Sequence, residues 1–211
     1  GALVSPARVG EPGLFRDTRA LTPGPGVVPD EINAPGWHDG ARSQRWLALP
    51  PGVRLHPEKD TGWGVDDGAV LVQTLFLDAA AGPRRIETRL LLKAENDWAA
   101  YSYVWNDAQT DADLEPGAGR RISLALADGP RDWLVPSRSD CLVCHSRAAN
   151  FALTLNTRPL NRTRRGEPGI SPLQWPEDDG VPVGQAAFPR DPRSPPRLNN
   201  PPDPHPPPLP P

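Results

Sequence analysis

Hydrophobic and polar positions follow a strand-like pattern through the middle of the chain. Residues 69–77 form an apolar run rich in β-branched side chains, and residues 84–93 place Ile86, Thr88 and further apolar side chains on one alternating face. Because only a short turn-rich break separates these two runs, they predict an antiparallel hairpin. Further strands are expected over residues 99–105, 121–126 and 131–135. The pattern therefore predicts a mainly β (α+β) fold built on an antiparallel sheet.

The flanking segments lack a sustained period. Residues 1–30 carry turn signals and are expected to form a lead-in, while the stretch from Glu31 to Pro50 is expected to be a short helix or an irregular segment. Proline becomes frequent towards the C-terminus, where it favours an extended polyproline conformation over helix or sheet. We therefore expect a lead-in over 1–30, a β-rich domain over 31–165 and a proline-rich extended tail over 166–211.

Composition narrows the classes of function. The net charge of −3 over 211 residues gives no polycation signature, which argues against a nucleic-acid partner. No run of the sequence approaches the roughly 18 apolar residues of a membrane span. The chain contains 30 prolines, no methionine and only two cysteines, and both cysteines lie in one short segment.

That segment reads Cys141-Leu142-Val143-Cys144-His145 and matches the attachment pattern of a c-type haem. Two thiols at this spacing reach the two vinyl groups on one edge of the porphyrin, and the histidine that follows them binds the iron. One such motif predicts one covalent haem c, with short helices around the motif.

Three other chemistries use a similar cysteine pair. A zinc site normally needs four protein ligands, and the sequence holds no second cysteine pair. A thioredoxin-like redox pair belongs to an α/β pattern, which is missing here. A disulfide between Cys141 and Cys144 would close a strained loop with little gain in chain entropy. Haem attachment is therefore the preferred interpretation.

The second axial position of the iron has several candidate ligands. Methionine, which many electron-transfer cytochromes use, is excluded within this chain because the sequence has none. His38 lies between glycines that permit close approach, and we expect it to be the distal ligand. His56, His205 and an open or water-bound site are the alternatives.

Other side chains are candidate contacts of the porphyrin. Four aromatic side chains are candidates for the haem wall: Tyr101, Tyr103 and Trp105, which alternate along one expected strand, and Trp133. The same alternating pattern is also typical of a plain core. Arg147 follows the motif closely, and its guanidinium suits the carboxylates of the haem propionates; Arg138 is the second candidate for that role.

The segment around the cysteine motif resembles the haem segment of exported c-type cytochrome domains. These domains are associated with quinoprotein dehydrogenase-like modules of the sorbosone and glucose type. The segment reads Pro136-Ser137-Arg138-Ser139-Asp140-Cys141-Leu142-Val143-Cys144-His145-Ser146-Arg147-Ala148-Ala149-Asn150. The resemblance extends from Glu11 to Arg162 and includes residues 11–15, 33–35, 39–41, 68–72, 84–91 and 101–111. It implies an electron-transfer domain in the periplasm or outside the cell. The order of strands followed by a late haem motif is also similar to the β-sheet cytochromes c′, which implies an open distal site.

The sequence thus predicts an extracytoplasmic monohaem cytochrome that exchanges electrons with redox partner proteins, more as a carrier than as an enzyme. A second hypothesis is a five-coordinate haem protein that binds small gases or peroxide. A third is a subunit of a polymeric cytochrome, a homo-oligomer or filament in which residues 189–211 contact neighbouring subunits.

Overall fold

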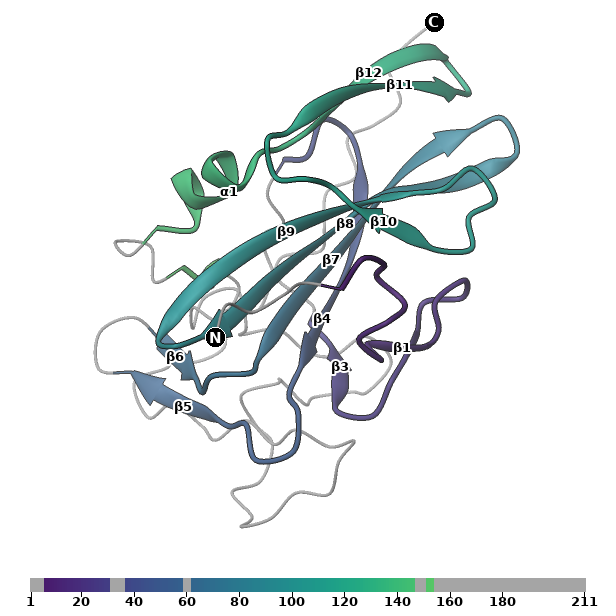
Figure 1. Cartoon of the computed structure of the whole chain (residues 1–211). Coiled ribbons are helices and arrows are strands. Elements are labelled where there is room, and N and C mark those ends of the chain that lie inside the picture. Colours follow the sequence, from purple (N-terminus) through teal and green to yellow (C-terminus); the bar gives the residue numbers. More distant parts are fainter. Residues whose placement is uncertain (1–5, 31–36, 59–61, 147–150, 154–211) are drawn as a thin grey trace, which may run out of the picture.

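The computed structural model describes residues 6–30, 37–58, 62–146 and 151–153, and the expected proline-rich tail lies outside these ranges. The described part is mainly β, with antiparallel strands and one short helix, α1 (Arg138–Cys144) (Figure 1). The largest sheet has six strands, which run in the spatial order β10 (Ala112–Leu114), β9 (Asp97–Trp105), β8 (Gly82–Ala94), β7 (Val70–Ala79), β4 (Arg42–Ala48) and β3 (Val27–Pro29).

Three two-stranded ladders accompany this sheet. They are β1 (Phe15–Asp17) with β2 (Thr22–Pro23), β5 (Leu55–Glu58) with β6 (Gly62–Val65), and β11 (Arg120–Leu126) with β12 (Gly129–Val135). The mainly β prediction is confirmed, and each of the five strands expected between residues 69 and 135 is present. The expected hairpin is β7–β8, which pairs from Ala79 with Gly82 to Val70 with Leu92.

The expectation of a helix or irregular segment between residues 31 and 50 is wrong for its described part. Residues 42–48 form β4, which lies inside the sheet between β7 and β3. Arg, Gln, Ala and Leu in this stretch have good helix propensity, but long-range pairing with β7 overrides that preference. The end of β4 also lacks the alternation of apolar and polar residues that is typical of a strand. Trp46 and Leu47 point to opposite faces of the sheet, and both are buried.

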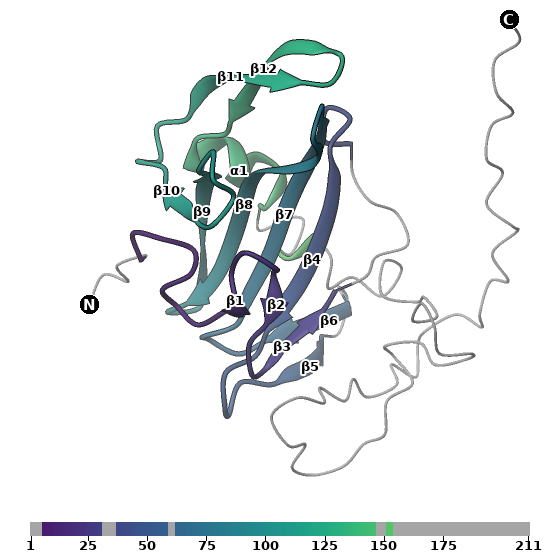
Figure 2. The ribbon, with the colours of Figure 1, turned by 90° about the vertical axis from the view of Figure 1, so that its right-hand side faces the viewer.

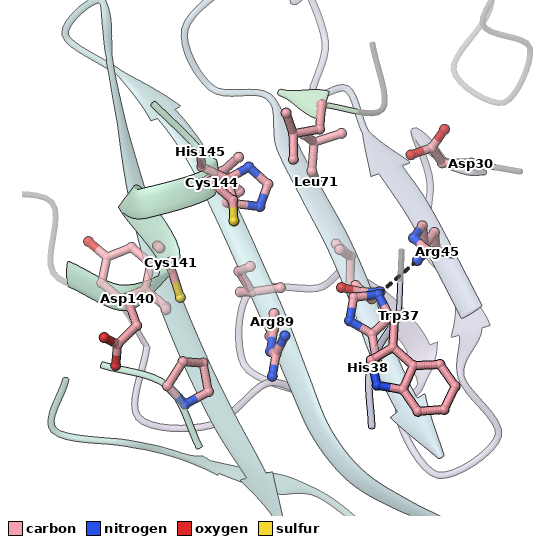
Figure 3. A pocket seen from close by; sticks show the side chains of 18 residues that line it. Asp30, Trp37, His38, Arg45, Leu71, Arg89, Asp140, Cys141, Cys144 and His145 are labelled. Carbon is pink, nitrogen blue, oxygen red and sulfur yellow. Dashed lines mark hydrogen bonds between the residues drawn. The ribbon is translucent and has the colours of Figure 1, made fainter. Parts of the chain in front are cut away.

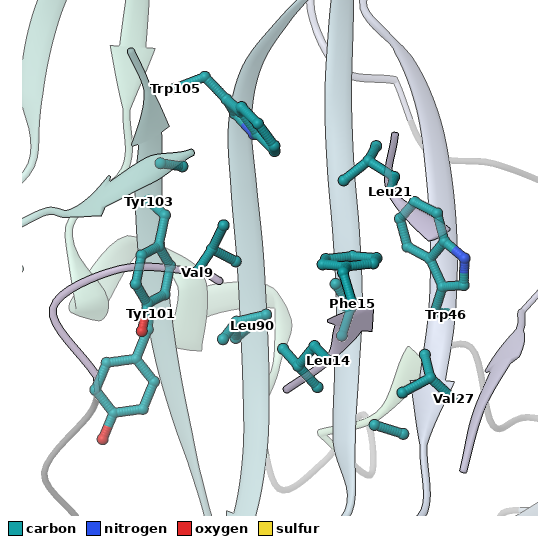
Figure 4. Close-up of a cluster of buried hydrophobic side chains, with 13 residues drawn as sticks. Val9, Leu14, Phe15, Leu21, Val27, Trp46, Leu90, Tyr101, Tyr103 and Trp105 are labelled. Atoms are coloured by element: carbon teal, nitrogen blue, oxygen red, sulfur yellow. The ribbon is translucent and has the colours of Figure 1, made fainter. Parts of the chain in front are cut away.

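The first face of the large sheet is covered by the N-terminal segment. Figure 2 shows β1 and β2 on one side of the sheet and α1 on the other. Val9, Leu14 and Phe15 pack against strand residues, among them Trp46 and Tyr103 (Figure 4). Residues 6–30 therefore contribute directly to the core of the β domain.

The N-terminal segment also extends the sheet beyond β10. The N–H of Val9 donates to the carbonyl of Ala112 (3.0 Å), and the N–H of Leu114 donates to the carbonyl of Ala7 (2.9 Å). Arg8 forms an isolated antiparallel bridge with Asp113. Residues 7–9 thus cover the outer edge of β10.

The second face carries two apolar clusters. One contains Leu47, Leu91 and Ala100 together with Ala152, and the other joins Leu75 and Ile86 to the β11–β12 ladder. Between the two clusters the register places one polar residue on each of three adjacent strands, because Arg45 pairs with Gln73 and Gln73 pairs with Arg89. We call Arg45, Gln73 and Arg89 the polar row.

A β-bulge sets part of this register. In the β7–β8 ladder the pairing shifts between Leu75 and Phe76, so that Phe76 pairs with Arg85 whereas Leu75 pairs with Glu87. Such a bulge adds one residue to one strand and turns the residues beyond it to the other face. The bulge therefore puts Arg89 opposite Gln73, on the same face.

The sequence was also expected to contain no membrane span. Within the part of the chain that it describes, no helix is long and apolar enough to cross a membrane.

Candidate functional site

The helix that carries the cysteines begins with a capping box. Ser137 is the N-cap; its hydroxyl accepts a hydrogen bond from the N–H of Asp140 (3.1 Å), while the Asp140 carboxylate accepts one from the N–H of Ser137 (2.9 Å). Hydrogen bonds from Ser137 lower the pKa of the Asp140 carboxyl. The capping box fixes where α1 starts and hence how its next turn is oriented.

Helical spacing brings the three residues of the motif to one face of α1. Cys144 and His145 follow Cys141 by three and four positions, and residues at these spacings are neighbours on a helix surface. His145 is the C-cap, and its N–H still donates to the carbonyl of Cys141 (3.0 Å), which continues the helical turn. The two thiols and the imidazole consequently form one wall.

That wall borders a cavity of about 420 Å³ between α1 and the second face of the sheet (Figure 3). A volume of this order lies within the range that small-molecule and cofactor pockets occupy. Apolar strand residues form much of the lining, and the polar row crosses it. The lining residues include Leu71, Leu91, Ala100, Arg45, Gln73, Arg89, Trp37, His38, Cys141, Cys144 and His145.

A backbone hydrogen bond orients the His145 ring. Its Nδ1 lies 2.5 Å from the carbonyl oxygen of Phe151, and because a carbonyl only accepts, Nδ1 carries the proton. With Nδ1 bound to this carbonyl, Nε2 is the ring nitrogen that can bind a metal. This is the arrangement found for metal-binding histidines, in which the nitrogen that does not bind the metal donates to a carbonyl or carboxylate.

His38 lies across the cavity from α1, on the side of β4 and β7 (Figure 3). Its Nε2 contacts Gln73 Nε2 (2.9 Å) and a terminal nitrogen of Arg45 (3.3 Å). Because a guanidinium only donates, His38 Nε2 acts as an acceptor. Burial lowers the pKa of the His38 imidazole, and the positive charges of Arg89 and Arg45 lower it further. His38 is therefore held as a neutral imidazole.

The two thiols differ in their surroundings. Both cysteines are free; Cys141 is half-buried and Cys144 is exposed. Burial raises the pKa of the Cys141 thiol, so less of it is thiolate at a given pH. Over the described residues, no three His, Cys, Asp or Glu side chains are grouped so that they could hold a bare metal ion.

The structure does not bring Tyr103 or Trp105 to the cavity. Both belong to the core on the first face of the sheet (Figure 4). Tyr103 donates to the carbonyl of Pro6, and Trp105 Nε1 donates to the hydroxyl of Thr88 (2.9 Å). These two aromatic side chains therefore have the plain core role that the sequence left open.

The remaining candidates are dispersed. Arg138 stacks over the ring of Tyr101, with its central carbon 4.8 Å from the ring centroid. His56 is exposed on β5, where it lies 3.7 Å from a carboxylate oxygen of Asp66. Arg147, His205 and residues 189–211 lie outside the described residues, so the predictions made for them stay predictions.

Sequence reasoning missed the polar row. Gln73 is the one polar amide in the apolar run of β7, and Arg89 shares its face of β8 with the buried residues Glu87 and Leu91. A polar residue at an inward-facing strand position is a signal of a binding site or a buried network. Pairing these two signals requires the strand register, which the sequence alone does not provide.

Three kinds of comparison with known proteins gave no match: no protein-family model, no curated protein and no solved structure is similar enough to this chain to be recognised as related. The function therefore has to be inferred from the cavity and from the residues that line it.

Proposed function

We propose that this protein is a periplasmic or extracellular c-type cytochrome that carries electrons through one haem, bonded to Cys141 and Cys144 and ligated by His145. The observation that carries the proposal is the convergence of both thiols and the His145 imidazole on one wall of a single cavity, with Nδ1 of His145 bound to Phe151. This donor set is the one that covalent haem attachment needs.

The surroundings of the donor set fit a flat apolar group. Leu71, Leu91 and Ala100 give the cavity an apolar floor on the sheet side. The helix α1 has no buried residue, although a helix of seven residues is marginal without packing. A macrocycle held between α1 and the sheet would supply the packing that this helix lacks.

Two exposed apolar side chains lie close to the same cavity. Trp37, which lines it, is 81% exposed, and Val143, which lies between the two cysteines, is 76% exposed. Single exposed apolar side chains are common on protein surfaces, but exposed apolar area beside a ligand cavity is a candidate surface for contact with a partner. Their position supports a haem edge that is accessible to a redox partner protein.

When bound, the haem supplies reversible one-electron oxidation and reduction of its iron. The chain's own residues hold and tune it. His145 is oriented by the Phe151 carbonyl, which strengthens the imidazole as a ligand. The apolar floor excludes water from the haem and so tunes the potential of its iron.

We further propose His38 as the distal ligand, because it lines the cavity opposite His145 and is neutral. Ligation through Nε2 requires His38 to release Gln73 and Arg45. A low-spin spectrum that becomes high-spin in His38→Ala supports this role, and an unchanged spectrum contradicts it.

One observation favours the second candidate function, a five-coordinate haem that binds small gases or peroxide. His38 Nε2 already accepts two hydrogen bonds, so the polar row can hold His38 away from a metal. Rapid binding of carbon monoxide to the reduced protein is expected for an open site. Slow or absent binding would exclude it and leave the electron carrier.

The main test is covalent attachment. The full chain is produced in a periplasm that contains a haem c maturation system, and its intact mass and pyridine haemochrome spectrum are measured. We expect the added mass of one haem and two thioether bonds. The double variant Cys141→Ala/Cys144→Ala should lose the added mass, whereas Val143→Ala, an exposed change between the two cysteines, should retain it. Wild-type protein without added mass would refute the proposal.

A further inference from the structure

We propose that Arg89 binds a propionate carboxylate of the haem, and that Glu87 holds the Arg89 guanidinium in place for this contact. This inference rests on the proposed function and assigns a role to a residue of the polar row. It places the carboxylate-binding group on the sheet, away from the segment that carries the cysteines.

The position of Arg89 is set by a buried network. Glu87 is completely buried, and its two carboxylate oxygens accept hydrogen bonds from Nε (2.8 Å) and one terminal nitrogen (3.0 Å) of Arg89. Trp133 Nε1 donates to the same carboxylate at 2.9 Å. A bidentate pair of this kind fixes both the position and the plane of a guanidinium. Glu87 and Trp133 are therefore positioning residues for Arg89.

The network leaves part of the guanidinium available. A guanidinium has five N–H groups, and Arg89 donates two of them to Glu87. The Arg89 side chain lines the cavity and is 28% exposed, so a ligand in the cavity can reach it. The planar fork of an arginine suits a carboxylate better than the point charge of a lysine does.

Arg89 lies on the sheet side of the cavity. It lines the cavity together with Cys141 of α1 and with His38 on the opposite wall. Figure 3 shows the Arg89 side chain on the floor of the cavity, between α1 and His38. Arg45 adds a second guanidinium to the same row, with the acidic Asp30 beside it.

The positions of the side groups on the porphyrin agree with thiols on α1 and guanidinium groups on the sheet. The vinyl groups that form thioethers lie on one side of the macrocycle, and the two propionates lie on the opposite side. A haem bonded to α1 through Cys141 and Cys144 therefore directs its carboxylates away from the thiols. Arg89 and Arg45 are the guanidinium groups that border the cavity in the described part of the chain, and both belong to the sheet.

The test compares two porphyrins that differ only in these carboxylates. The full chain without covalent haem, with its cysteines reduced, is titrated with iron protoporphyrin IX and with its dimethyl ester, and the two dissociation constants are compared. We expect wild-type protein to bind the free acid at least about tenfold more tightly, the effect of one hydrogen bond between charged groups. Because the ester alters only the ligand, this comparison does not perturb the fold.

Variants then assign the preference to Arg89. Arg89→Lys keeps a charge beside Glu87 but removes the fork, and Glu87→Gln/Arg89→Gln avoids leaving a buried carboxylate unpaired. Both are expected to reduce the preference for the free acid to about twofold or less. Arg120→Lys is the matched control for Arg89→Lys, because Arg120 makes the same two-bonded contact with the buried Glu115 and does not line the cavity.

A second measurement uses the covalently loaded protein. Resonance Raman spectra report the bending modes of the propionates, which shift when a carboxylate accepts a strong hydrogen bond. We expect a shift in Arg89→Lys and none in Arg120→Lys. Equal binding of acid and ester by wild type, binding of neither, or a preference that survives both Arg89 variants would overturn the inference. None of these outcomes bears on covalent attachment, which tests the proposed function separately.

Discussion

Trp133→Phe is expected to destabilise the fold more than Trp105→Phe, although the two substitutions remove the same atoms. The two indoles are almost equally buried, with 3% and 4% of their surfaces exposed. Each donates one hydrogen bond of 2.9 Å through Nε1, Trp133 to the Glu87 carboxylate and Trp105 to the hydroxyl of Thr88. The two changes therefore differ chiefly in the charge of the acceptor that loses its donor.

The magnitude follows from that difference. A hydrogen bond to a charged group contributes about 1.5–3 kcal/mol to stability, and a bond between neutral groups contributes about 0.5–1.5 kcal/mol. The lost ring atoms add a similar cost in both variants. Arg85 lies over the Trp105 ring at 4.6 Å, and a phenyl ring retains part of that contact. We expect Trp133→Phe to lower the free energy of unfolding by about 1 kcal/mol more than Trp105→Phe does.

The assay is urea unfolding of the full chain without haem, followed by far-ultraviolet circular dichroism, because the loss of a tryptophan alters the fluorescence signal. The same substitution in the Glu87→Gln/Arg89→Gln background should lose its extra cost, since the acceptor there is neutral. Equal destabilisation by the two tryptophan substitutions, or a larger effect at Trp105, would refute the assignment of Trp133 to a charged network.

Three further predictions concern the two cysteines, the N-cap of α1 and a glycine that lies close to this N-cap. Iodoacetamide should modify Cys144 before Cys141 in the reduced protein without haem, because Cys144 is exposed and burial raises the Cys141 pKa; peptide mapping that finds equal rates would contradict this. Ser137→Ala removes the N-cap hydroxyl and should weaken α1 by about 1 kcal/mol, seen as faster hydrogen exchange of its amides. Gly119→Ala should lower the melting temperature more than Gly52→Ala. Both glycines have positive φ. A Cβ at 119 would lie 2.7 Å from the backbone nitrogen of Ser137, whereas a Cβ at 52 would have no described heavy atom within 4 Å apart from those of residues 51–53.

The strands that could be predicted are those in which local pattern and tertiary structure agree. Residues 69–77 and 84–93 alternate or are continuously apolar, and a short turn joins them, so β7 and β8 followed from the sequence. β4 did not, because its partner strand β7 comes after it by more than 20 residues and its own residues favour helix.

The candidate site also has one part that could be predicted from the sequence and one that could not. Cys141, Cys144 and His145 lie within five residues of one another, so the hypothesis that they hold a haem could be formed from their spacing alone. Gln73 and Arg89 become neighbours only through the bulge at Leu75 and Phe76. Without the extra residue that the bulge adds to β8, Arg89 would face the opposite side of the sheet. No local feature of the sequence predicts this bulge.

The covering of β10 by residues 7–9 has a consequence for encounters between copies of this protein. An exposed sheet edge is a template on which another chain can add a strand, and here an incoming strand would first have to displace the N-terminal segment. The opposite edge is β3, a strand of three residues that ends in Pro29, which has no N–H to donate. Crowded molecules are thus not expected to pair through the two edges of the six-stranded sheet.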